Sequence, residues 1–329
     1  MVTDLDILDK ELLNILQSRF PLNEEPFKQI ARELETSEDD VIARTRELKA
    51  RRVLRQISAI FDSRGLGYQS SLVAGKAAPG RLDEAAQVIN AHPGVSHNYA
   101  RNHDFNLWFT ITLPPGQDLE ETVNNLARRA GLLAVRLLPT LRLFKIGVEF
   151  DMLEGVSASK GSTKAATVKD TAKLTPLEVE IVRQLQKDLP LDKRPFRAMA
   201  EAVGISESEL LRHANSFLHR GVMRRYAAVL RHQNAGFRAN GMICWLVPEA
   251  QVEEIGNTIA SFRAVSHCYQ RPSYPDWPYS IFSMVHARSR AEVEQIVAEM
   301  SKTAGLEDYV VLYSAKEYKK ERVRYFPDN

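Results

Sequence analysis

Val95-Ser96-His97-Asn98-Tyr99-Ala100-Arg101 is a heptapeptide that returns later in the chain as Val265-Ser266-His267-Cys268-Tyr269-Gln270-Arg271. In an extended strand, the His, Tyr and Arg of the shared frame Val-Ser-His-x-Tyr-x-Arg project from one face, about 6.7 Å per step. Such a face offers a proton donor, a phenolic hydrogen-bond partner and a guanidinium that fits a carboxylate. A single copy would be explained as well by a polar strand face at a domain surface. Two copies in matching places favour a functional site.

The heptapeptides belong to a tandem duplication of the chain. Pro21-Leu22 and Pro26-Phe27 reappear 169 residues later as Pro190-Leu191 and Pro195-Phe196, and the heptapeptides are offset by 170. Between the repeats, residues 152–173 are rich in Ser, Thr, Ala, Gly and Lys, without an apolar period. Because that composition cannot bury a core, we predict a flexible linker there. The chain therefore has the organisation of two once-separate subunits that became fused.

Each repeat begins with the pattern of three short helices. Apolar residues recur at helical spacing over residues 5–16 and 174–185. Ser37-x-x-Asp40 and Ser206-x-x-Glu209 are capping-box starts for the third helix of each trio. Since an apolar strand follows, the trios predict winged helix-turn-helix domains.

Helix-turn-helix domains commonly bind DNA, but the charges of these trios argue against that partner. The first turn of the third helix is Glu38-Asp39-Asp40 in one copy and Glu207-Ser208-Glu209 in the other. These acids complement the helix dipole, yet they repel the phosphates that a recognition helix meets with Arg, Lys, Asn or Gln. Basic residues follow only later, from Lys49 to Arg55, and leave room for residual contact. DNA binding is therefore not expected.

After each trio, strand and helix patterns alternate in the order βαββαβ. In the first repeat, strands are expected over 70–74, 95–101, 106–113 and 135–144, with helices over 82–91 and 119–130. In the second, strands are expected over 241–247, 265–271, 279–285 and 309–313, with helices over 252–262 and 290–303. This order predicts a ferredoxin-like α+β domain in each repeat. Because such sheets tend to pair, we expect an intrachain pseudo-dimer of the two repeats.

The predicted domains follow from these patterns. They are helix-turn-helix domains over 1–60 and 174–229, ferredoxin-like domains over 61–151 and 230–329, and the linker over 152–173. A chain of 329 residues, 44% hydrophobic and 26% charged, is typical of a soluble protein with two or more domains. A homodimer of the whole chain is also compatible with this organisation.

Charge, cysteines and apolar runs exclude several classes of protein. The net charge of +2 creates no global basic field for nucleic acid or an anionic membrane. Cys244 and Cys268 form no Cys-x-x-Cys pair, which argues against metal clusters and a disulfide framework. No apolar run reaches the ~18 residues of a membrane span, and the acidic start of the chain is unlike a signal peptide. We therefore expect a cytoplasmic protein without a metal site of its own.

A family resemblance is carried by residues of both repeats and excludes the linker. In the first repeat they are Phe61-Asp62-Ser63-Arg64-x-Leu66-Gly67-Tyr68 and residues 95–110, of which 98–110 are the most specific. In the second they are residues 224–232, 239–242 and the second heptapeptide. On these residues the chain resembles the Lrp/AsnC architecture, and more narrowly the siroheme decarboxylases of heme d1 and alternative heme biosynthesis. Each half is similar to one subunit type of that enzyme, as in its fused forms.

The resemblance implies that siroheme loses the carboxylates of its C12 and C18 acetate side chains, giving 12,18-didecarboxysiroheme. Siroheme carries eight carboxylates, so its pocket needs several guanidinium groups, which bind carboxylates through two hydrogen bonds. The candidate substrate-binding residues are Arg101, Arg224, Arg225, Arg231 and Arg271. The resemblance implies no cofactor beyond the iron macrocycle of the substrate itself, because the ring can accept the developing charge.

Loss of carbon dioxide leaves electron density that a proton must quench, and an imidazole can supply it near neutral pH. The candidate catalytic residues are His97, His103 and His267, with Tyr99 and Tyr269 to orient or relay. A histidine could instead ligate the substrate's iron, and both roles stay open. His286 follows an apolar strand and is interpreted as structural.

The repeats differ in their polar residues, which suggests a division of labour. His103 has Ser273 as its counterpart, and Arg224-Arg225 has Arg55-Gln56. Either one repeat holds the substrate while the other supports it, or the site is shared between them. Of these, we favour a main pocket in the second repeat. Two alternatives remain: an Lrp-type transcription regulator with a ligand-sensing domain, and a non-catalytic heme-binding module.

Overall fold

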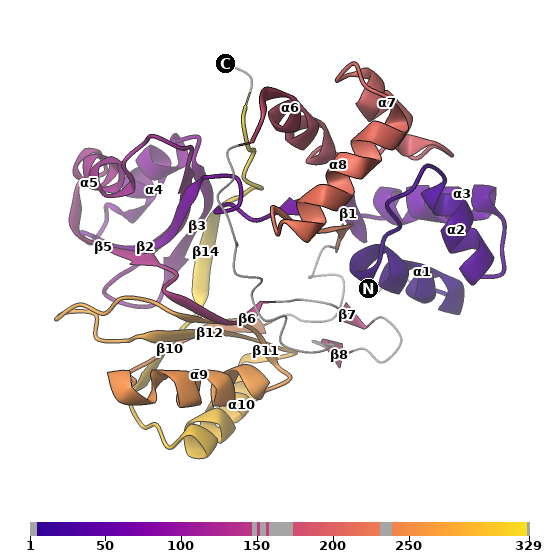
Figure 1. The fold of residues 1–329 in the computed structure, drawn as a ribbon. Helices are drawn as coiled ribbons and strands as arrows, with labels where there is room; N and C mark the ends of the chain where they lie inside the picture. Colours follow the sequence, from indigo (N-terminus) through magenta and orange to yellow (C-terminus); the bar gives the residue numbers. More distant parts are fainter. Residues whose placement is uncertain (1–4, 147–149, 152–155, 158–173, 231–238, 328–329) are drawn as a thin grey trace.

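The computed structural model describes residues 5–146, 150–151, 156–157, 174–230 and 239–327. The helical domains of the two repeats lie together, beside two five-stranded sheets with their own helices (Figure 1). The predicted linker over 152–173 lies outside the described residues except for β8 (Val156–Ser157), which pairs with β7 (Phe150–Asp151).

Each repeat begins with the predicted helical trio. The helices are α1 (Ile7–Ser18), α2 (Pro26–Glu33) and α3 (Glu38–Ala50), then α6 (Pro176–Leu185), α7 (Pro195–Glu201) and α8 (Glu207–His219). Ser37 and Ser206 cap α3 and α8 by accepting the amides of Asp40 and Glu209. Such caps satisfy amides that the first helical turn leaves unpaired, which is why the sequence located these helix starts correctly.

The strands that follow the trios pair with each other across the repeats. β1 (Leu54–Phe61) and β9 (Met223–Leu230) run antiparallel, with Ser58 opposite Ala227. Apolar residues of both trios pack on this sheet in one core, so that Phe27 of the first repeat and Phe196 of the second belong to the same cluster. The two helix-turn-helix domains therefore form a single unit.

Ion pairs occupy the acidic turns of this helical unit. Arg194, just before α7, bonds Glu207 of α8 at 2.7 Å and Glu24 of the first repeat at 2.5 Å. Lys193 pairs with Asp39 of α3 at 2.9 Å. The acids of both recognition turns thus contact the protein itself. That DNA is not a partner remains a prediction, which these contacts support.

The remaining strands form two five-stranded sheets. The first has the order β14-β3-β4-β2-β5 and the second β13-β10-β12-β11-β6. The first-repeat strands are β2 (Gln69–Ala77), β3 (Val95–Arg101), β4 (Leu107–Leu113), β5 (Leu132–Pro139) and β6 (Arg142–Ile146). The second-repeat strands are β10 (Ala239–Trp245), β11 (Val265–Gln270), β12 (Ile281–Ala287), β13 (Tyr309–Leu312) and β14 (Ser314–Lys320).

Helices cover the outer face of each sheet (Figure 1). These are α4 (Leu82–Asn90) and α5 (Leu119–Arg129) on the first sheet, then η2 (Glu249–Gln251), α9 (Val252–Ser261) and α10 (Arg290–Ala304) with the second. The predicted fold class, a duplicated helix-turn-helix plus ferredoxin-like α+β domain, is confirmed.

Each sheet is completed by a strand from the other repeat. β6 pairs with β11, with Ile146 opposite His267, and β14 pairs with β3, with Lys320 opposite His97. The sequence predicts one strand over 135–144, but the chain leaves the first sheet after Pro139 and enters the second at Arg142. β14 was not predicted, because its mostly exposed residues follow no apolar alternation. The predicted segments 61–151 and 230–329 therefore each contain one strand of the other's sheet.

The inner faces of the sheets meet in an aromatic core that both repeats share. The rings of Trp108 and Trp277 lie 5.1 Å apart in an edge-to-face arrangement, which is a favourable geometry for aromatic pairs. Cys244 and Phe282 are buried in the same cluster. The two repeats thus pack as an intrachain pseudo-dimer, as the sequence predicted.

Candidate active site

The first polar row (His97, Tyr99 and Arg101) lies on β3 with its three side chains on one face. The rings of His97 and Tyr99 are stacked 6.3 Å apart, and the Arg101 guanidinium lies 5.7 Å from the Tyr99 ring centre. The alternate residue Asn98 points the other way, since it bonds the carbonyl of Ala86 in α4. The predicted arrangement of the heptapeptide is therefore present.

The second polar row (His267, Tyr269 and Arg271) on β11 repeats this geometry. The rings of His267 and Tyr269 are stacked 6.0 Å apart, and the Arg271 guanidinium lies 4.9 Å from the Tyr269 ring centre. Ser266 bonds Nδ1 of His267 at 2.8 Å, as Ser96 bonds His97 at 3.0 Å. A serine bond therefore fixes one nitrogen of each imidazole.

The arginines of both rows reach into the interface between the sheets. Arg101 donates to the carbonyl of Leu312 at 2.9 Å, and Arg271 donates to that of Leu138, so each bonds the other repeat. Burial lowers the pKa of both guanidiniums to about 10. Arg101 and Arg271, both predicted to bind the substrate, are therefore held mainly by contacts within the protein. The Nε atom of each is buried and has no hydrogen-bond partner among the described residues.

A cationic group (Arg55, Arg225, Lys320 and Arg322) lies at the histidine end of the first row. Arg322, in the segment after β14, donates to Ser58 of β1 at 2.5 Å. Burial lowers the pKa of Arg322, and the nearby charges of Arg55 and Arg225 lower it further. Because like charges brought together repel one another, this arrangement favours an anionic ligand.

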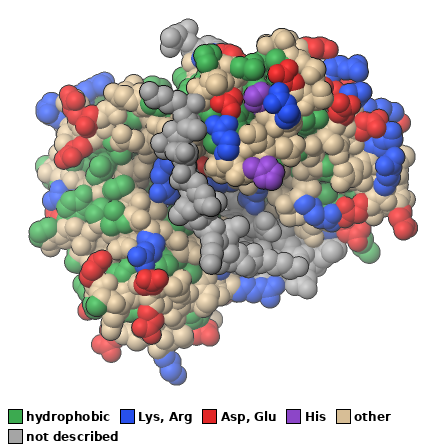
Figure 2. All heavy atoms as spheres, viewed as in Figure 1, with side chains coloured by type: hydrophobic (Ala, Val, Ile, Leu, Met, Phe, Trp, Pro, Cys, Tyr) green, Lys and Arg blue, Asp and Glu red, His purple; other side chains and the backbone are tan. Residues whose placement is uncertain are grey.

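Asp188 and Glu317 are two carboxylates of the described residues that lie near this group. Asp188 lies close to Arg322, but its Oδ1 already accepts from Lys49 at 2.8 Å and from the amide of Ile57 at 3.0 Å. Glu317 is 3.9 Å from Lys320. Figure 2 shows Lys and Arg side chains on both sides of the junction between the sheets and the helical unit. The junction is therefore suited to a polyanion.

His97 and Tyr99 have perturbed acidities. Burial lowers the pKa of His97 to about 4, with Lys320 and Arg55 adding to the shift. Burial, together with Glu317 on β14, raises the pKa of Tyr99 to about 12. Both groups are therefore neutral at pH 7 in the protein without ligand.

The second row lies beside different neighbours. β6 places Leu143 opposite Tyr269 and Ile146 opposite His267, so the tyrosine and histidine of this row have apolar partners, where those of the first row have Glu317 and Lys320. Burial raises the pKa of Tyr269, while Arg271 and Arg224 act to lower it. Apolar side chains from β6, with Arg271 and Arg224 nearby, suit a flat macrocycle that carries carboxylates at its edge.

Arg224 is the cation whose charge is most directly compensated. Its Nε and Nη2 donate to Oδ2 of Asp62 at 3.1 and 2.7 Å. Burial acts to raise the pKa of Asp62, but the Arg224 guanidinium holds it below its usual value. The charge of Arg225 acts on Arg322, and Arg231 lies outside the described residues.

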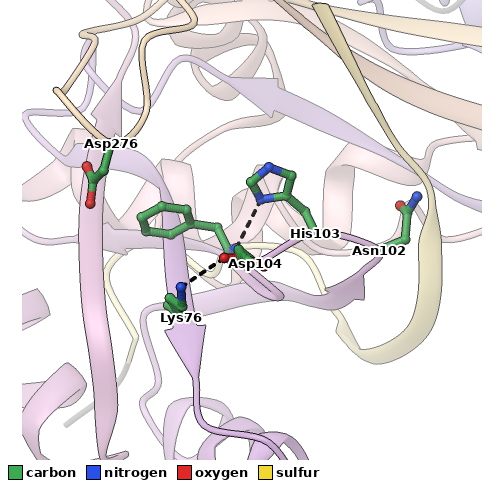
Figure 3. A pocket seen from close by; sticks show the side chains of 6 residues that line it. Lys76, Asn102, His103, Asp104 and Asp276 are labelled. Atoms are coloured by element: carbon green, nitrogen blue, oxygen red, sulfur yellow. Dashed lines mark hydrogen bonds and ion pairs between the residues drawn. The ribbon is translucent and has the colours of Figure 1, made fainter.

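His103 lies apart from the other candidates. It lines a pocket of about 550 Å³ at the turn between β3 and β4, with Lys76, Asn102, Asp104, Phe105 and Asp276 (Figure 3). Its Nδ1 accepts the amide of Phe105 at 3.0 Å, and burial lowers its pKa. Its ring is 5.2 Å from that of Trp277. Each row therefore brings one histidine and one tyrosine together, His97 with Tyr99 and His267 with Tyr269. His103 belongs to neither row.

Sequence analysis did not select Lys320 or Arg322. The run Lys319-Lys320-Glu321-Arg322-Val323-Arg324 carried a signal, because it concentrates cations near the end of the chain. Arg55 was treated only as the counterpart of Arg224. The pairing of β14 with β3 brings Lys320 and the segment that carries Arg322 close to His97. No local sequence pattern predicts this pairing.

Two family models match the chain, each of them twice. The AsnC-like ligand binding domain matches residues 65–145 and 234–319. The siroheme decarboxylase NirDL-like HTH domain matches residues 9–55 and 178–224. The fold and the paired rows thus define a fused pair of AsnC-like ligand-binding domains, each preceded by a helix-turn-helix.

Relatives that match over both repeats identify the family. A siroheme decarboxylase of Hydrogenobacter thermophilus is 40% identical, covering 97% of this chain and 95% of the relative. The crystal structure of the siroheme decarboxylase NirDL in co-complex with an iron-uroporphyrin III analogue is 36% identical, with a TM-score of 0.78, covering 97% of this chain and 95% of that one. The chain belongs to the siroheme decarboxylase family.

Separate subunits among the relatives each match about half of the chain. The alpha and beta subunits of the siroheme decarboxylase of Desulfovibrio desulfuricans are 38% and 36% identical. Each match covers 46% of this chain, with 87% of the alpha subunit and 96% of the beta subunit. The duplication is therefore a fusion of two subunit-like halves.

Two further features concern membranes and metals. In the part of the chain that the structure describes, no helix is both long and apolar enough to span a membrane. Across the same residues, no three His, Cys, Asp or Glu side chains are grouped so that they could hold a metal ion.

Proposed function

We propose that the protein removes the carboxylates of the C12 and C18 acetate side chains of siroheme, giving 12,18-didecarboxysiroheme for heme d1 biosynthesis. The main support for this proposal is the similarity to siroheme decarboxylases over nearly the full length of the chain, which includes both repeats. That similarity favours a carboxy-lyase over the transcription regulator considered from the sequence. A cytoplasmic location is part of the same proposal.

The chemistry requires one proton for each carboxylate. When the bond between the methylene carbon and the carboxylate breaks, carbon dioxide leaves and its electron pair stays on the methylene, delocalised into the ring. A proton then forms the new C–H bond, which converts each acetate into a methyl group. Because the macrocycle of the substrate stabilises the electron pair, we propose that no separate cofactor takes part.

The two kinds of residue divide these tasks. Arginine and lysine at the junction bind carboxylates of siroheme through charge-assisted hydrogen bonds. His267 or His97 supplies the proton, and the stacked Tyr269 or Tyr99 holds the imidazole plane. The apolar Ile146 opposite His267 and Leu143 opposite Tyr269 favour the second row as the place where the macrocycle reacts.

The direct test is anaerobic incubation of the purified chain with siroheme, followed by mass analysis of the tetrapyrrole. We expect the mass of the tetrapyrrole to fall by two carbon dioxide units. Heat-denatured protein is the control. Siroheme that stays unchanged under conditions where it binds would contradict the decarboxylase proposal.

Siroheme binding should also cause proton uptake by His97. Its pKa of about 4 is depressed by burial and by Lys320 and Arg55, so carboxylates that neutralise these cations raise it. At about pH 5.5 a histidine with its ordinary pKa near 6.5 is mostly protonated, so a raised pKa means that binding takes up a proton. Calorimetry in two buffers with different ionisation enthalpies measures this uptake.

The matched control for this measurement is His97→Gln, which keeps a polar side chain but cannot take up the proton. We expect its uptake to be smaller than that of the wild type by up to one proton. Equal uptake by both proteins would show that carboxylates of siroheme do not lie against His97.

A further inference from the structure

A chain of hydrogen bonds lies behind His267. Oγ of Ser266 bonds Nδ1 of His267 at 2.8 Å, and Nε2 of His286 bonds the same Oγ at 2.8 Å. A serine hydroxyl can accept one hydrogen bond while donating another. The three side chains therefore form a continuous path along which protons can move.

The adjacent strands β11 and β12 place these residues next to each other. Ser266 is 1% exposed, whereas His286 and His267 are half-buried. The middle of the path is thus shielded from water, while the histidines at its two ends are partly exposed. When Ser266 donates to Nδ1, neutral His267 carries its proton on Nε2, the nitrogen not bonded to the serine.

The first repeat has only the inner half of this path. The strand register that places His286 after Val285, opposite Val265, places Thr112 after Ile111, opposite Val95. The Thr112 hydroxyl bonds Ser70 at 2.9 Å. Within the described residues, the Ser96–His97 pair therefore has no second histidine behind it.

His286 and Thr112 differ in their side chains, but their backbone amides make equivalent hydrogen bonds. The amide of His286 donates to the carbonyl of Ala264, as that of Thr112 donates to Gly94. A threonine is thus sufficient to hold this strand position in the fold. A histidine there adds a group that can bind and release protons.

We propose that Ser266 and His286 form a proton relay that protonates Nδ1 of His267 as His267 gives up its Nε2 proton during decarboxylation. This inference rests on the proposed function and adds to it the route of the proton. His267 gives its Nε2 proton to the methylene carbon and takes the Ser266 proton on Nδ1. Ser266 takes a proton from the imidazolium of His286, which ends neutral, and His267 is left neutral with its proton on Nδ1. Nε2 of His267 then takes a proton from water, while the Nδ1 proton returns to Ser266 and a Ser266 proton returns to His286, which restores the starting state. The new C–H bond consumes one proton, and water supplies one.

The relay makes His286 a positioning residue, since it acts through Ser266 and His267 without touching siroheme. His286→Thr copies the first repeat and should lower kcat at least about tenfold, as expected for a lost proton-transfer path. KM for siroheme should stay the same, because no carboxylate ligand is lost. Thr112→Ala, at the equivalent position of the first repeat, is the matched control and should keep the wild-type kcat.

Chemical rescue separates a relay from a structural role. In His286→Gly, added imidazole should restore kcat, because it can occupy the vacated space and deliver the proton. Ser266→Ala should lose kcat, while Ser266→Thr, which keeps the hydroxyl, should retain most of it. If His286→Gly does not fold, this serine pair gives the same comparison.

Three results would overturn the relay: a wild-type kcat in His286→Thr, equal losses in kcat and siroheme affinity, or no restoration by imidazole in folded His286→Gly. They are distinct from failure of the proposed function, in which the wild-type protein itself would release no carbon dioxide from siroheme.

Discussion

Replacing His267 by alanine is expected to remove turnover while siroheme still binds. The substitution deletes the proposed proton donor and leaves the arginines and lysine of the junction in place. Loss of a general acid typically lowers the rate by 10²–10⁴-fold, so kcat should fall by about that factor. The measurements are the rate of carbon dioxide release and the absorption spectrum of the bound macrocycle.

His97→Ala tests which row reacts. We expect a milder loss, because the first row borders a charged strand and lacks the histidine that lies behind His267. His219→Ala, on the exposed end of α8, is the control and should behave as the wild type. If His97→Ala abolished turnover while His267→Ala kept it, the reacting row would be that of the first repeat.

Replacing Arg322 by glutamine should weaken siroheme binding about tenfold to a hundredfold. A hydrogen bond to a charged group contributes roughly 1.5–3 kcal/mol, which corresponds to that range of affinity. Arg225→Gln should have a similar effect. Arg322→Gln also removes the hydrogen bond to Ser58, so a fall in the melting temperature is expected beside the loss of affinity. Titration of siroheme under anaerobic conditions and thermal denaturation measure the two quantities.

Arg324→Gln is the matched control, since Arg324 is exposed and lies two residues along the same segment. It should bind siroheme as the wild type does. Equal, small effects of Arg322→Gln and Arg324→Gln would mean that the cationic group does not hold the substrate. Arg224→Gln should likewise lower stability as well as affinity, because it leaves the carboxylate of Asp62 without its partner.

Arg55 belongs to the cationic group near His97, so it cannot serve as a control for Arg224. By sequence, Arg55 is the first-repeat counterpart of Arg224. Its charge contributes to the low pKa of both His97 and Arg322. We now expect Arg55→Gln to reduce affinity, and comparison with Arg324→Gln tests this.

Strand exchange gives a physical reason for the two halves to act together. β14 carries Glu317 and Lys320 from the second repeat to Tyr99 and His97 of the first. β6 carries Ile146 from the first repeat to His267 of the second. Each row therefore has one wall from the other half, and neither half alone provides a complete site.

Much of the candidate site was predictable because it is written in short-range patterns. The alternation of β3 and β11 puts His, Tyr and Arg on one face regardless of what packs around them, and the stacked rings confirm it. The prediction grouped His103 with them by the same spacing, but the chain turns after Arg101 and the alternation ends there. His286 was interpreted as structural because it follows an apolar strand, and its bond to Ser266 joins residues that are distant in the sequence.

The sequence by itself determined the duplication, the helical trios with their serine caps, the βαββαβ order and the two rows, because helix caps and strand alternation are local properties of the chain. Only the tertiary structure decided which strands complete which sheet, that Arg101 and Arg271 bond across the repeats, and that Arg322 lies with Arg55 and Arg225. These contacts join residues far apart in the sequence. These contacts are stabilised by packing and charge in the folded protein. They produce no periodic pattern in the sequence from which they could be predicted.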